Sequence, residues 1–556
     1  MQQRITPTLL GILLLALALA VAGGCTFDLG FRPVEDGPVS GEDGSGSGDH
    51  TMPDDGFVPA ENPPHEFGVE QLPEQRTYDN GTGTVYVDSA DERQQIDGFG
   101  ASNAWLTPPT DSGIRANIVR LLFSRRYGIG LNILRTRVPF RENPGDYQDG
   151  FVQHDGPDSY AYTVNGDGAK TFALNWNSWE LSNTRTLIGA IDDLPYGPGD
   201  LVVMSTPWTP PNRWKTSYRG AGYTYDPVDY PAYGGTLDPS HNADYADILA
   251  DYALGFEANM GVPLRALSIQ NEPNFIPLNN GSPAYESSWW TGEQIRHFLP
   301  TLRARFDLKN VPDSVKVVAA EGTGMDQSMV DASLADADAA AALDIVGVHQ
   351  YDNETPWHNG TDPAANLGAE LLPDADAAGK RIWMTEASWG GPNSDAPPDF
   401  LDWAKMIHFD LTIGEINAFI YWWLWSENPT QGALITLTDD GYLANRRMFA
   451  MGQYSRFVRP GWKRVGSTTE PTSGVYTSAF RNPHRSEMAV VLINDRAGDE
   501  TVTIDVDRVS AFSSIRAWRT SDGEELAPID APSSSGASAA VELPSRSVTT
   551  VYFEVQ

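Results

Sequence analysis

The sequence has little cysteine and little positive charge for its length. Among 556 residues it carries one cysteine, so it cannot form an internal disulfide framework or a cysteine-cluster metal site. Lysine and arginine number 38 against 74 aspartate and glutamate residues, and the formal net charge is -36. A chain this acidic repels phosphate polymers and has no general attraction to anionic lipid, so we expect no nucleic-acid partner.

Long apolar runs are also scarce, and the clearest one lies at the N-terminus. Residues 9–22 are apolar, too few to span a bilayer comfortably, and they end in small residues as a signal peptide does, so residues 1–24 are predicted to be one. Cys25 follows within Ala22-Gly23-Gly24-Cys25, which resembles a bacterial lipoprotein signal with a lipidated cysteine, although Ala22 stands where leucine is usual. Ordinary secretion with an incidental cysteine is the alternative. We therefore expect an exported monomer, either secreted or held at the cell surface or outer membrane by an N-terminal lipid alone.

Residues 25–75 are rich in glycine, aspartate, serine and proline and contain few residues to bury, so they are predicted to form a flexible acidic linker. Beyond them, eight short apolar runs alternate with segments of helical apolar spacing. Continuous apolar runs are typical of parallel strands covered on both faces. The pattern predicts an α/β fold, a (β/α)8 TIM barrel over residues 96–454. Its strands are expected at 95–100, 131–138, 201–206, 264–270, 315–320, 343–349, 381–385 and 416–422.

An open doubly wound sheet competes with the barrel. Such a sheet usually has a glycine-rich phosphate turn after its first strand, and Gly128-Ile129-Gly130-Leu131-Asn132-Ile133 does not match that pattern. After the barrel, short strands separated by turn residues indicate an all-β module. Residues 76–95 plus 455–556 are predicted to form this β-sandwich side domain, because an isolated strand at 84–88 precedes the barrel.

Two glutamates follow predicted strands at the end of the barrel where the βα loops open. Glu272 comes just after the fourth run, and Glu386 closes the seventh. Strand ends that face one cavity can place two carboxyl groups on opposite sides of a sugar. Hydrolysis of a glycosidic bond needs an acid at the departing oxygen and a second carboxylate at the anomeric carbon. Most glutamates at loop starts are solvated or salt-bridged, so the pair alone is weak evidence.

Six motifs in order make the chain resemble glycoside hydrolase family 30, a family of clan A, from about residue 84 to the C-terminus. They are Ile96-Asp97-Gly98-Phe99-Gly100-Ala101, Ser205-Thr206-Pro207-Trp208-Thr209-Pro210-Pro211, Gln270-Asn271-Glu272-Pro273, His349-Gln350-Tyr351, Thr385-Glu386 and Gly452-Gln453-Tyr454-Ser455-Arg456-Phe457-Val458-Arg459-Pro460-Gly461. The resemblance implies a retaining double displacement in which Glu272 is the acid/base and Glu386 the nucleophile. The mechanism then needs Glu272 protonated and Glu386 ionised at the start.

The resemblance also implies roles around this pair. Asn271 would donate to the sugar 2-hydroxyl, and Arg135 would neutralise and orient Glu386, although a structural salt bridge is the alternative. Tyr351 would donate to Glu386, while His349 would hold the strand end or touch sugar unless it is only structural.

Trp208 and Trp422 would offer flat faces to a pyranose, unless they belong to the core. Trp289 and Trp290 are weaker candidates for a further sugar site.

The expected substrate is a β-linked plant polysaccharide. Tyr285-Glu286-Ser287-Ser288-Trp289-Trp290 looks like the xylan-cleaving branches of the family, yet Ser426-Glu427-Asn428 stands where relatives specific for glucuronoxylan carry arginines that grip the uronate. We therefore expect an endo-β-1,4-xylanase that does not depend on glucuronate branches. A β-1,6-glucanase, a β-1,6-galactanase or a glucosylceramidase-like β-glycosidase remains the alternative.

Three other classes are weighed against this enzyme. A non-catalytic surface glycan-binding lipoprotein would use the tryptophans but has no need of both glutamates. A metal-dependent hydrolase is disfavoured because the nine histidines include no His-Glu-x-x-His motif, and no Gly-x-Ser-x-Gly elbow of a serine hydrolase occurs. We expect neither a metal nor another cofactor.

Overall fold

The chain is seen in a computed structural model that describes residues 52, 54–60, 67–73, 76–140, 162–211, 214–216, 234–276, 278–279, 282–283, 286–351, 366–388, 400–427 and 432–555. Cys25 and the expected signal peptide, residues 1–24, lie outside these residues. Within them, no helix is both long enough and apolar enough to cross a membrane.

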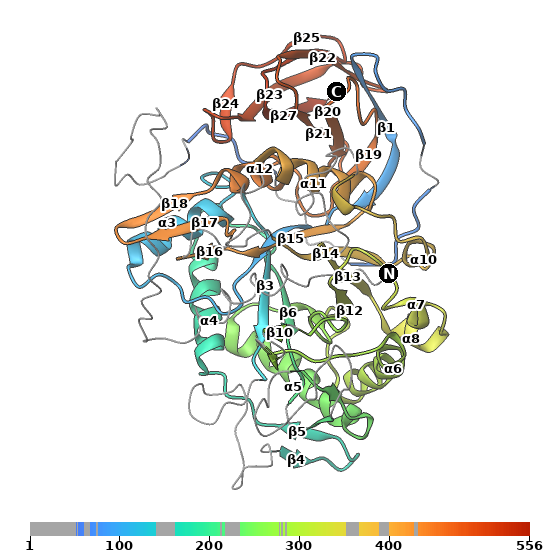
Figure 1. Cartoon of the computed structure of the whole chain (residues 1–556). Coiled ribbons are helices and arrows are strands. Elements are labelled where there is room, and N and C mark those ends of the chain that lie inside the picture. The colour runs from blue at the N-terminus through green and yellow to red at the C-terminus, as the bar shows by residue number, and fades with distance from the viewer. Residues whose placement is uncertain are drawn as a thin grey trace, which may run out of the picture.

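Eight parallel strands close into a barrel in the order β12-β13-β14-β15-β2-β3-β6-β9 (Figure 1). Each of the eight predicted runs contains or overlaps one of these strands, so the TIM-barrel prediction is confirmed. All eight are buried almost throughout, which explains why they read as continuous apolar runs. Their bounds are β2 Gly98–Ser102, β3 Ile133–Val138, β6 Val202–Pro207, β9 Leu264–Ser268, β12 Lys316–Gly322, β13 Ile345–His349, β14 Arg381–Ala387 and β15 Ala418–Trp423.

Helices cover the barrel, and their ends follow from local sequence. Thr291 and Gln294 form a reciprocal capping box at the start of α6, and Asn310 ends that helix in the left-handed conformation. Gly261, at φ 86°, ends α5 in the same way. The helices are α3 Ser112–Phe123, α4 Trp179–Asp192, α5 Asn242–Met260, α6 Gly292–Lys309, α7 Asp331–Leu334, α8 Ala337–Ala342, α10 Pro373–Ala377, α11 Phe400–Thr412 and α12 Arg446–Ser455, with 3-10 turns η2 Pro239–His241 and η3 Asn366–Gly368.

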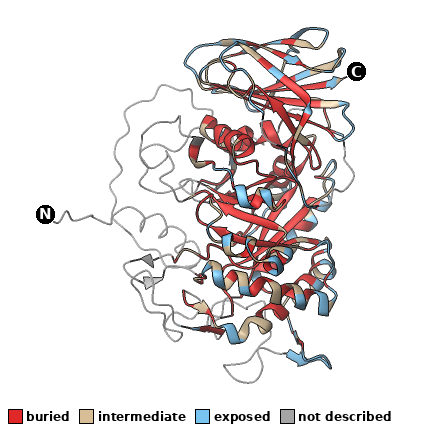
Figure 2. Ribbon diagram, turned by 90° about the vertical axis from the view of Figure 1, so that its right-hand side faces the viewer, coloured by how far each residue is buried: buried red, intermediate tan, exposed pale blue. Residues whose placement is uncertain are grey.

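A ten-stranded sheet forms the second module, in the order β24-β23-β27-β21-β20-β19-β1-β22-β26-β25. It encloses its own hydrophobic core, and the almost fully buried α11 and α12 lie between it and the barrel (Figures 1 and 2). The predicted side β-sandwich is thus present. Its strands are β1 Thr84–Gln95, β19 Lys463–Ser467, β20 Val475–Arg481, β21 Glu487–Asn494, β22 Glu500–Val506, β23 Phe512–Thr520, β24 Ala527–Ile529, β25 Ser533–Ser535, β26 Ser538–Leu543 and β27 Ser547–Val555.

Short strands decorate the loops between the barrel elements. The pairs β4–β5, β7–β8 and β10–β11 are hairpins, and β16, β17 and β18 form a three-stranded sheet after the last barrel strand. Their bounds are β4 Tyr162–Val164, β5 Lys170–Phe172, β7 Lys215–Thr216, β8 Thr236–Leu237, β10 Leu278–Asn279, β11 Ser282–Pro283, β16 Trp425–Ser426, β17 Ile435–Thr438 and β18 Gly441–Ala444.

The segment before β1 departs from the prediction of a linker with little to bury. Within residues 25–75, Met52, Phe57 and Phe67 are buried. Phe67 belongs to the cluster of side chains that fills the barrel interior, where its ring meets Trp383 edge-on at 5.2 Å. The few apolar residues of this polar segment therefore anchor it to the folded domains, so the prediction of a free spacer is wrong for these residues.

Asp55 and Phe57 attach the same segment where the barrel meets the sandwich. Arg456 Nη2 donates to Asp55 Oδ1 at 2.9 Å, and the Trp518 indole donates to Asp55 Oδ2 at 2.6 Å. Phe57 lies in an aromatic cluster, with its ring centroid 4.7 Å from that of Trp518 and 4.9 Å from that of Tyr552. Asp54 of the same segment accepts from Arg126 of the barrel at 2.8 Å, so the segment contacts both domains and braces them against each other.

Replacing Phe57 by alanine is expected to lower the free energy of unfolding by about 3–5 kcal/mol, because a buried aromatic ring is removed and a cavity remains. Denaturant unfolding of the full chain, followed by tryptophan fluorescence, measures the change. Val69→Ala is the control, because Val69 belongs to the same segment but is 77% exposed. Equal unfolding midpoints for the two variants would contradict the bracing role.

Candidate active site

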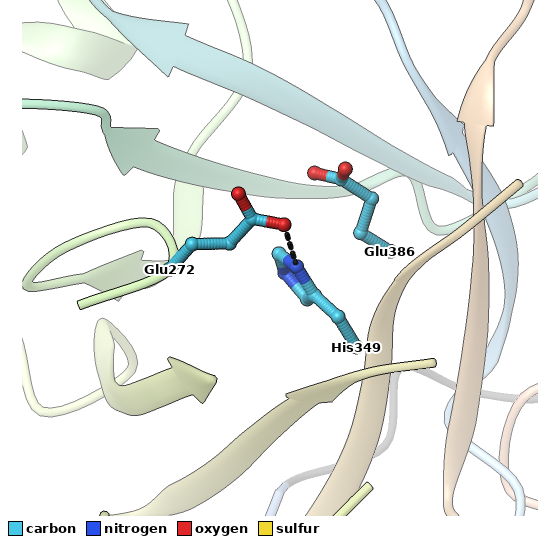
Figure 3. A group of neighbouring side chains, drawn as sticks. All are labelled: Glu272, His349 and Glu386. Atoms are coloured by element: carbon cyan, nitrogen blue, oxygen red, sulfur yellow. Dashed lines mark hydrogen bonds and ion pairs between the residues drawn. The ribbon is translucent and has the colours of Figure 1, made fainter. Parts of the chain in front are cut away.

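The two glutamates meet at the barrel end where the strands finish (Figure 3). Glu272 follows β9, Glu386 lies in β14, and His349 ends β13. One carboxylate oxygen of each glutamate and one ring nitrogen of His349 lie within 4.8 Å of one another. All three residues are buried. The parallel topology has therefore brought Glu272 and Glu386 together although they lie more than a hundred positions apart in the chain.

Arg135 of β3 connects the groups of this cluster. Its side chain is fully buried, and its Nη1 donates to Glu386 Oε2 at 2.6 Å. Its Nη2 donates to Asn271 Oδ1 at 2.7 Å and to Glu321 Oε1 at 3.1 Å. Burial disfavours the charged guanidinium, but Glu321 and Glu386 outweigh it and raise the pKa of Arg135. Because Asn271 accepts through its oxygen, its amide nitrogen keeps its donor capacity for another partner.

Tyr351 completes the surroundings of Glu386. Its hydroxyl donates to Glu386 Oε1 at 2.9 Å, so each oxygen of this carboxyl group receives a hydrogen bond. Burial, reinforced by the charge of Glu386, raises the pKa of Tyr351 well above its usual value and keeps the hydroxyl protonated. Burial also raises the pKa of Glu386, and the Glu272 carboxylate adds to the effect, whereas His349, Arg135 and Tyr351 oppose it.

Glu321, in β12, is a third buried carboxylate of the cluster that the sequence interpretation missed. It ends the fifth apolar run, as Glu386 ends the seventh, so its position carried a usable signal. Although burial disfavours the ionised form, Arg135 and His349 hold the pKa of Glu321 at about 2. This residue is therefore a negative charge in contact with Arg135 and His349, which in turn contact the two catalytic candidates.

His349 lies between two carboxylates. Its Nδ1 is 3.2 Å from Glu272 Oε1, and its Nε2 is 3.7 Å from Glu321 Oε1. Burial disfavours the charged ring, yet the carboxylates of Glu386, Glu272 and Glu321 raise the pKa of His349 to about 9. Because the His349 side chain is fully buried, we expect it to balance the charge of the carboxylates rather than to contact sugar directly.

The backbone of Glu272, which follows β9, and of Glu321, near the end of β12, is held in an unusual conformation. Glu272 and Glu321 have φ of 43° and 55°, in the left-handed region that non-glycine residues seldom adopt. The Glu272 amide donates to the Glu321 carbonyl at 3.0 Å, which joins the two strand ends. Gly347 is needed beside them, because a Cβ at that position would lie 2.9 Å from Glu321 Cγ. Strain of this kind concentrates at functional sites.

Three tryptophans surround the Arg135 side of the cluster. The guanidinium carbon of Arg135 lies 4.7 Å from the ring centroid of Trp208 and 5.8 Å from that of Trp422. Both tryptophan rings are buried, and both contact the Arg135 guanidinium. Contact between these rings and a sugar stays a prediction. Trp105, which the sequence interpretation missed, packs edge-on against both rings and is partly exposed.

Trp290 is a core residue rather than a candidate for a further sugar site. It is 1% exposed and packs against Tyr245 and Phe298. Its neighbour Trp289 is partly exposed, and its backbone amide donates to the Gly235 carbonyl at 2.8 Å. An adjacent pair of tryptophans in a loop gives no sequence signal for which ring faces inward, so the prediction was wrong for Trp290.

The trio of Glu272, His349 and Glu386 is spaced closely enough to hold a metal ion, with one nitrogen and two oxygens to offer. A cation there would compete with charges already present. The Arg135 guanidinium is bonded to Glu386, and the His349 ring favours its protonated form. The charges already present suit acid–base and nucleophilic chemistry by two carboxyl groups better than metal coordination.

Comparisons with known proteins agree with this geometry. Residues 461–551 match the model of the glycosyl hydrolase family 30 beta sandwich domain. The glucuronoxylanase XynC of Bacillus subtilis (strain 168) is 29% identical over 354 residues, which cover 63% of this chain and 73% of the relative. The endo-1,6-beta-D-glucanase neg1 of Aspergillus fumigatus is 22% identical over 454 residues, 76% of this chain and 83% of the relative.

A solved structure extends the similarity to both domains. The glycoside hydrolase family 30 subfamily 8 xylanase Xyn30A from Clostridium acetobutylicum is 27% identical and superposes with a TM-score of 0.63, covering 85% of this chain and all of that one. This chain thus combines a barrel, a side sandwich and paired carboxylates, and its sequence is similar to those of such enzymes. These findings support glycoside hydrolase family 30 for this chain, which is accordingly an O-glycosyl hydrolase.

Proposed function

We propose that the chain is a retaining endo-β-1,4-xylanase with Glu272 as acid/base and Glu386 as nucleophile. The observation that carries this proposal is the approach of the two carboxyl groups, which have oxygens within 4.8 Å of each other. Retaining enzymes hold these groups about 5–5.5 Å apart, whereas inverting enzymes leave room for a water at about 6.5–9.5 Å. The short separation leaves no space for a water between sugar and carboxylate, so direct attack by Glu386 is favoured.

In the first step a Glu386 oxygen attacks the anomeric carbon and forms an ester bond. The bond from this carbon to the leaving oxygen breaks, its electron pair stays on that oxygen, and Glu272 supplies the proton. In the second step water attacks the same carbon, gives its proton to Glu272, and the ester electrons return to Glu386. Arg135 and Tyr351 bond the two Glu386 oxygens and so orient the nucleophile.

The mechanism requires Glu272 to carry a proton at the start of the reaction. Repulsion between two carboxylates this close opposes ionisation of both, and the first step needs the proton on the acid rather than on the nucleophile. Glu386 accepts from a guanidinium and a phenol, which favour its ionised form. Asn271, held through its oxygen by Arg135, directs its amide nitrogen toward the substrate 2-hydroxyl, where a hydrogen bond strengthens in the transition state. Trp105, Trp208 and Trp422 form the apolar wall for the sugar ring.

Similarity to a glucuronoxylanase and to a family 30 xylanase supports xylan as the substrate. The loop after β15 argues against dependence on the uronate branch. Ser426 is buried, and Glu427 is exposed with a charge that would repel a glucuronate. Asn428 lies outside the described residues. A β-1,6-glucanase is the second candidate, supported by the similarity to such an enzyme of Aspergillus fumigatus.

We propose an exported monomer whose partner is polysaccharide, with Cys25 as the lipidation point, no nucleic-acid partner and no cofactor. Its proposed domains are the signal peptide, residues 1–24, a linker, residues 25–75, whose buried residues Met52, Phe57 and Phe67 are anchored to the folded domains, the barrel, residues 96–454, and the side domain, residues 76–95 plus 455–556.

Product analysis on linear xylan, glucuronoxylan and β-1,6-glucan tests the substrate assignment. The purified chain is expected to cleave linear xylan and glucuronoxylan with kcat/KM values within about tenfold of each other. It should leave β-1,6-glucan essentially intact. Mass spectrometry of the xylan products should show oligomers with and without uronate branches. Cleavage of glucuronoxylan alone, with one branch on every product, would overturn the interpretation of Ser426 and Asn428, and cleavage of β-1,6-glucan alone would establish the second candidate.

A further inference from the structure

His349 is surrounded by carboxylates on both of its nitrogens. Nδ1 faces Glu272 at 3.2 Å and Nε2 faces Glu321 at 3.7 Å. A neutral imidazole carries one N–H: with the proton on Nδ1, the Nε2 lone pair would face the Glu321 carboxylate, and with the proton on Nε2, Nδ1 could accept from Glu272 only while that carboxyl group is protonated. Only the doubly protonated ring offers a donor in both directions. The charged ring is therefore the one form that suits both protonation states of Glu272 through which the reaction passes.

We propose that Glu321 is a positioning residue that keeps His349 doubly protonated, so that the catalytic cluster stays electrically neutral through both steps of the reaction. This inference rests on the proposed retaining hydrolysis. Glu321 does not touch the reacting atoms and acts through His349 and Arg135, both of which it contacts.

The charges of the cluster balance in each state. In the resting enzyme the cations Arg135 and His349 face the carboxylates Glu321 and Glu386, while Glu272 is protonated. In the glycosyl-enzyme Glu386 is a neutral ester and Glu272 is ionised, so two cations again face two carboxylates. The proton transfer and the ester formation therefore move charge within the cluster without changing its total. That this total is zero matters because these side chains are buried and water screens an excess charge poorly.

A neutral His349 would disturb this balance at the first step. The resting cluster would carry one excess negative charge, which opposes ionisation of Glu272 when it gives up its proton. Loss of Glu321 would remove the carboxylate facing Nε2, so the ring would lose its proton at lower pH. The high pKa of His349 and the low pKa of Glu321 agree with the proposed pairing.

Among the described residues, Glu386, Tyr351 and Arg135 also lie near His349 and affect the charge of its ring. Glu386 approaches from β14 and favours the charged ring. Tyr351, on the same strand-end segment, lies edge-on at 6.0 Å and stays neutral. Arg135, from β3, contacts Glu321 rather than the ring and opposes its charge only at longer range. The carboxylates therefore dominate the field at His349.

The test is direct titration of His349 by NMR in the full chain with isotope-labelled histidine, with the resonance assigned by its loss in His349→Asn. In the wild type the ring is expected to be charged at pH 7 and to lose its proton near pH 9. In Glu321→Gln the midpoint should fall by about one pH unit or more, a tenfold shift in the proton equilibrium. The alkaline limb of kcat/KM on xylan should move in the same direction, and Glu321→Asp should restore it.

Glu415→Gln is the matched control. Glu415 is also a buried carboxylate bonded to two arginines, Arg93 and Arg464, but it lies outside the catalytic cluster. This variant is expected to lose stability while its pH profile and His349 titration stay unchanged.

Two results would overturn the inference. One is a wild-type His349 ring that is neutral at pH 7, which needs no variant to observe. The other is a folded Glu321→Gln protein with an unshifted titration and an unshifted alkaline limb. Failure of the proposed function looks different, because a chain that cleaves none of the three glycans can still show the shifted titration of His349.

Discussion

Replacing Glu386 by alanine is expected to lower kcat on xylan by about 10⁴-fold or more, because no covalent intermediate can then form. Arg135 and Tyr351 would lose their shared partner but remain in place, held by Glu321 and by Ser388. Reducing-end release from linear xylan under saturating substrate measures the change. A far-UV spectrum and an unfolding midpoint confirm that the variant is folded.

Azide makes this prediction specific to a nucleophile. The alanine leaves a space on the face of the sugar where Glu386 attacked, so azide can enter there and displace an activated aryl leaving group. Attack from that face inverts the configuration, and the product of a β-xyloside should be the α-glycosyl azide, which NMR identifies. Full wild-type release by the alanine variant would remove the enzyme interpretation and leave a glycan-binding protein.

Replacing Glu272 by alanine is expected to have an effect that depends on the leaving group. On xylan, whose sugar hydroxyl leaves poorly, kcat/KM should fall by about 10²–10⁴-fold, the usual contribution of a general acid. On an aryl xyloside with an acidic phenol the first step needs little acid assistance, so kcat/KM should stay near the wild-type value. The second step still lacks its base, so the glycosyl-enzyme should accumulate on Glu386 and be visible by mass spectrometry.

The control for this variant is Glu286→Gln. Glu286 lies in the loop after Glu272, is buried, and accepts a hydrogen bond from Arg137 rather than from the catalytic cluster. Any loss it causes should be equal for xylan and aryl xyloside. Azide should restore turnover of the aryl substrate in Glu272→Ala and have no such effect on Glu286→Gln, and the glycosyl azide from Glu272→Ala should have retained configuration. An equal loss on both substrates for Glu272→Ala would argue against its role as acid.

Much of the fold was predictable because parallel barrel strands are buried on both faces. The continuous apolar run at residues 343–349 has the length and composition of β13, and the glutamates at strand ends follow from the topology. The proximity of Glu272 and Glu386 could be inferred from the order of the predicted strands alone, since all strands of a parallel barrel end at one face. Arg135, Asn271 and Tyr351 were placed in the cluster by motif resemblance.

Other features could not be predicted because they depend on packing between distant segments. Phe57 and Phe67 are isolated apolar residues in a polar segment, and nothing local indicates that Phe67 enters the barrel interior. Glu321 was missed because a single glutamate after an apolar run is usually solvated. The orientations of Trp289 and Trp290 depend on which ring meets the core formed by Tyr245 and Phe298.

The position of β1 has a consequence for how the chain can mature. Val87 pairs with Ser467 on one side and with Val506 on the other, so the strand remains without its neighbours until nearly the whole polypeptide has been synthesised. Contacts this distant in sequence form slowly, and an unpaired strand edge invites association with other chains in the meantime. Truncation after α12 would leave that edge exposed permanently, so we expect the isolated barrel to aggregate rather than to serve as a minimal catalyst.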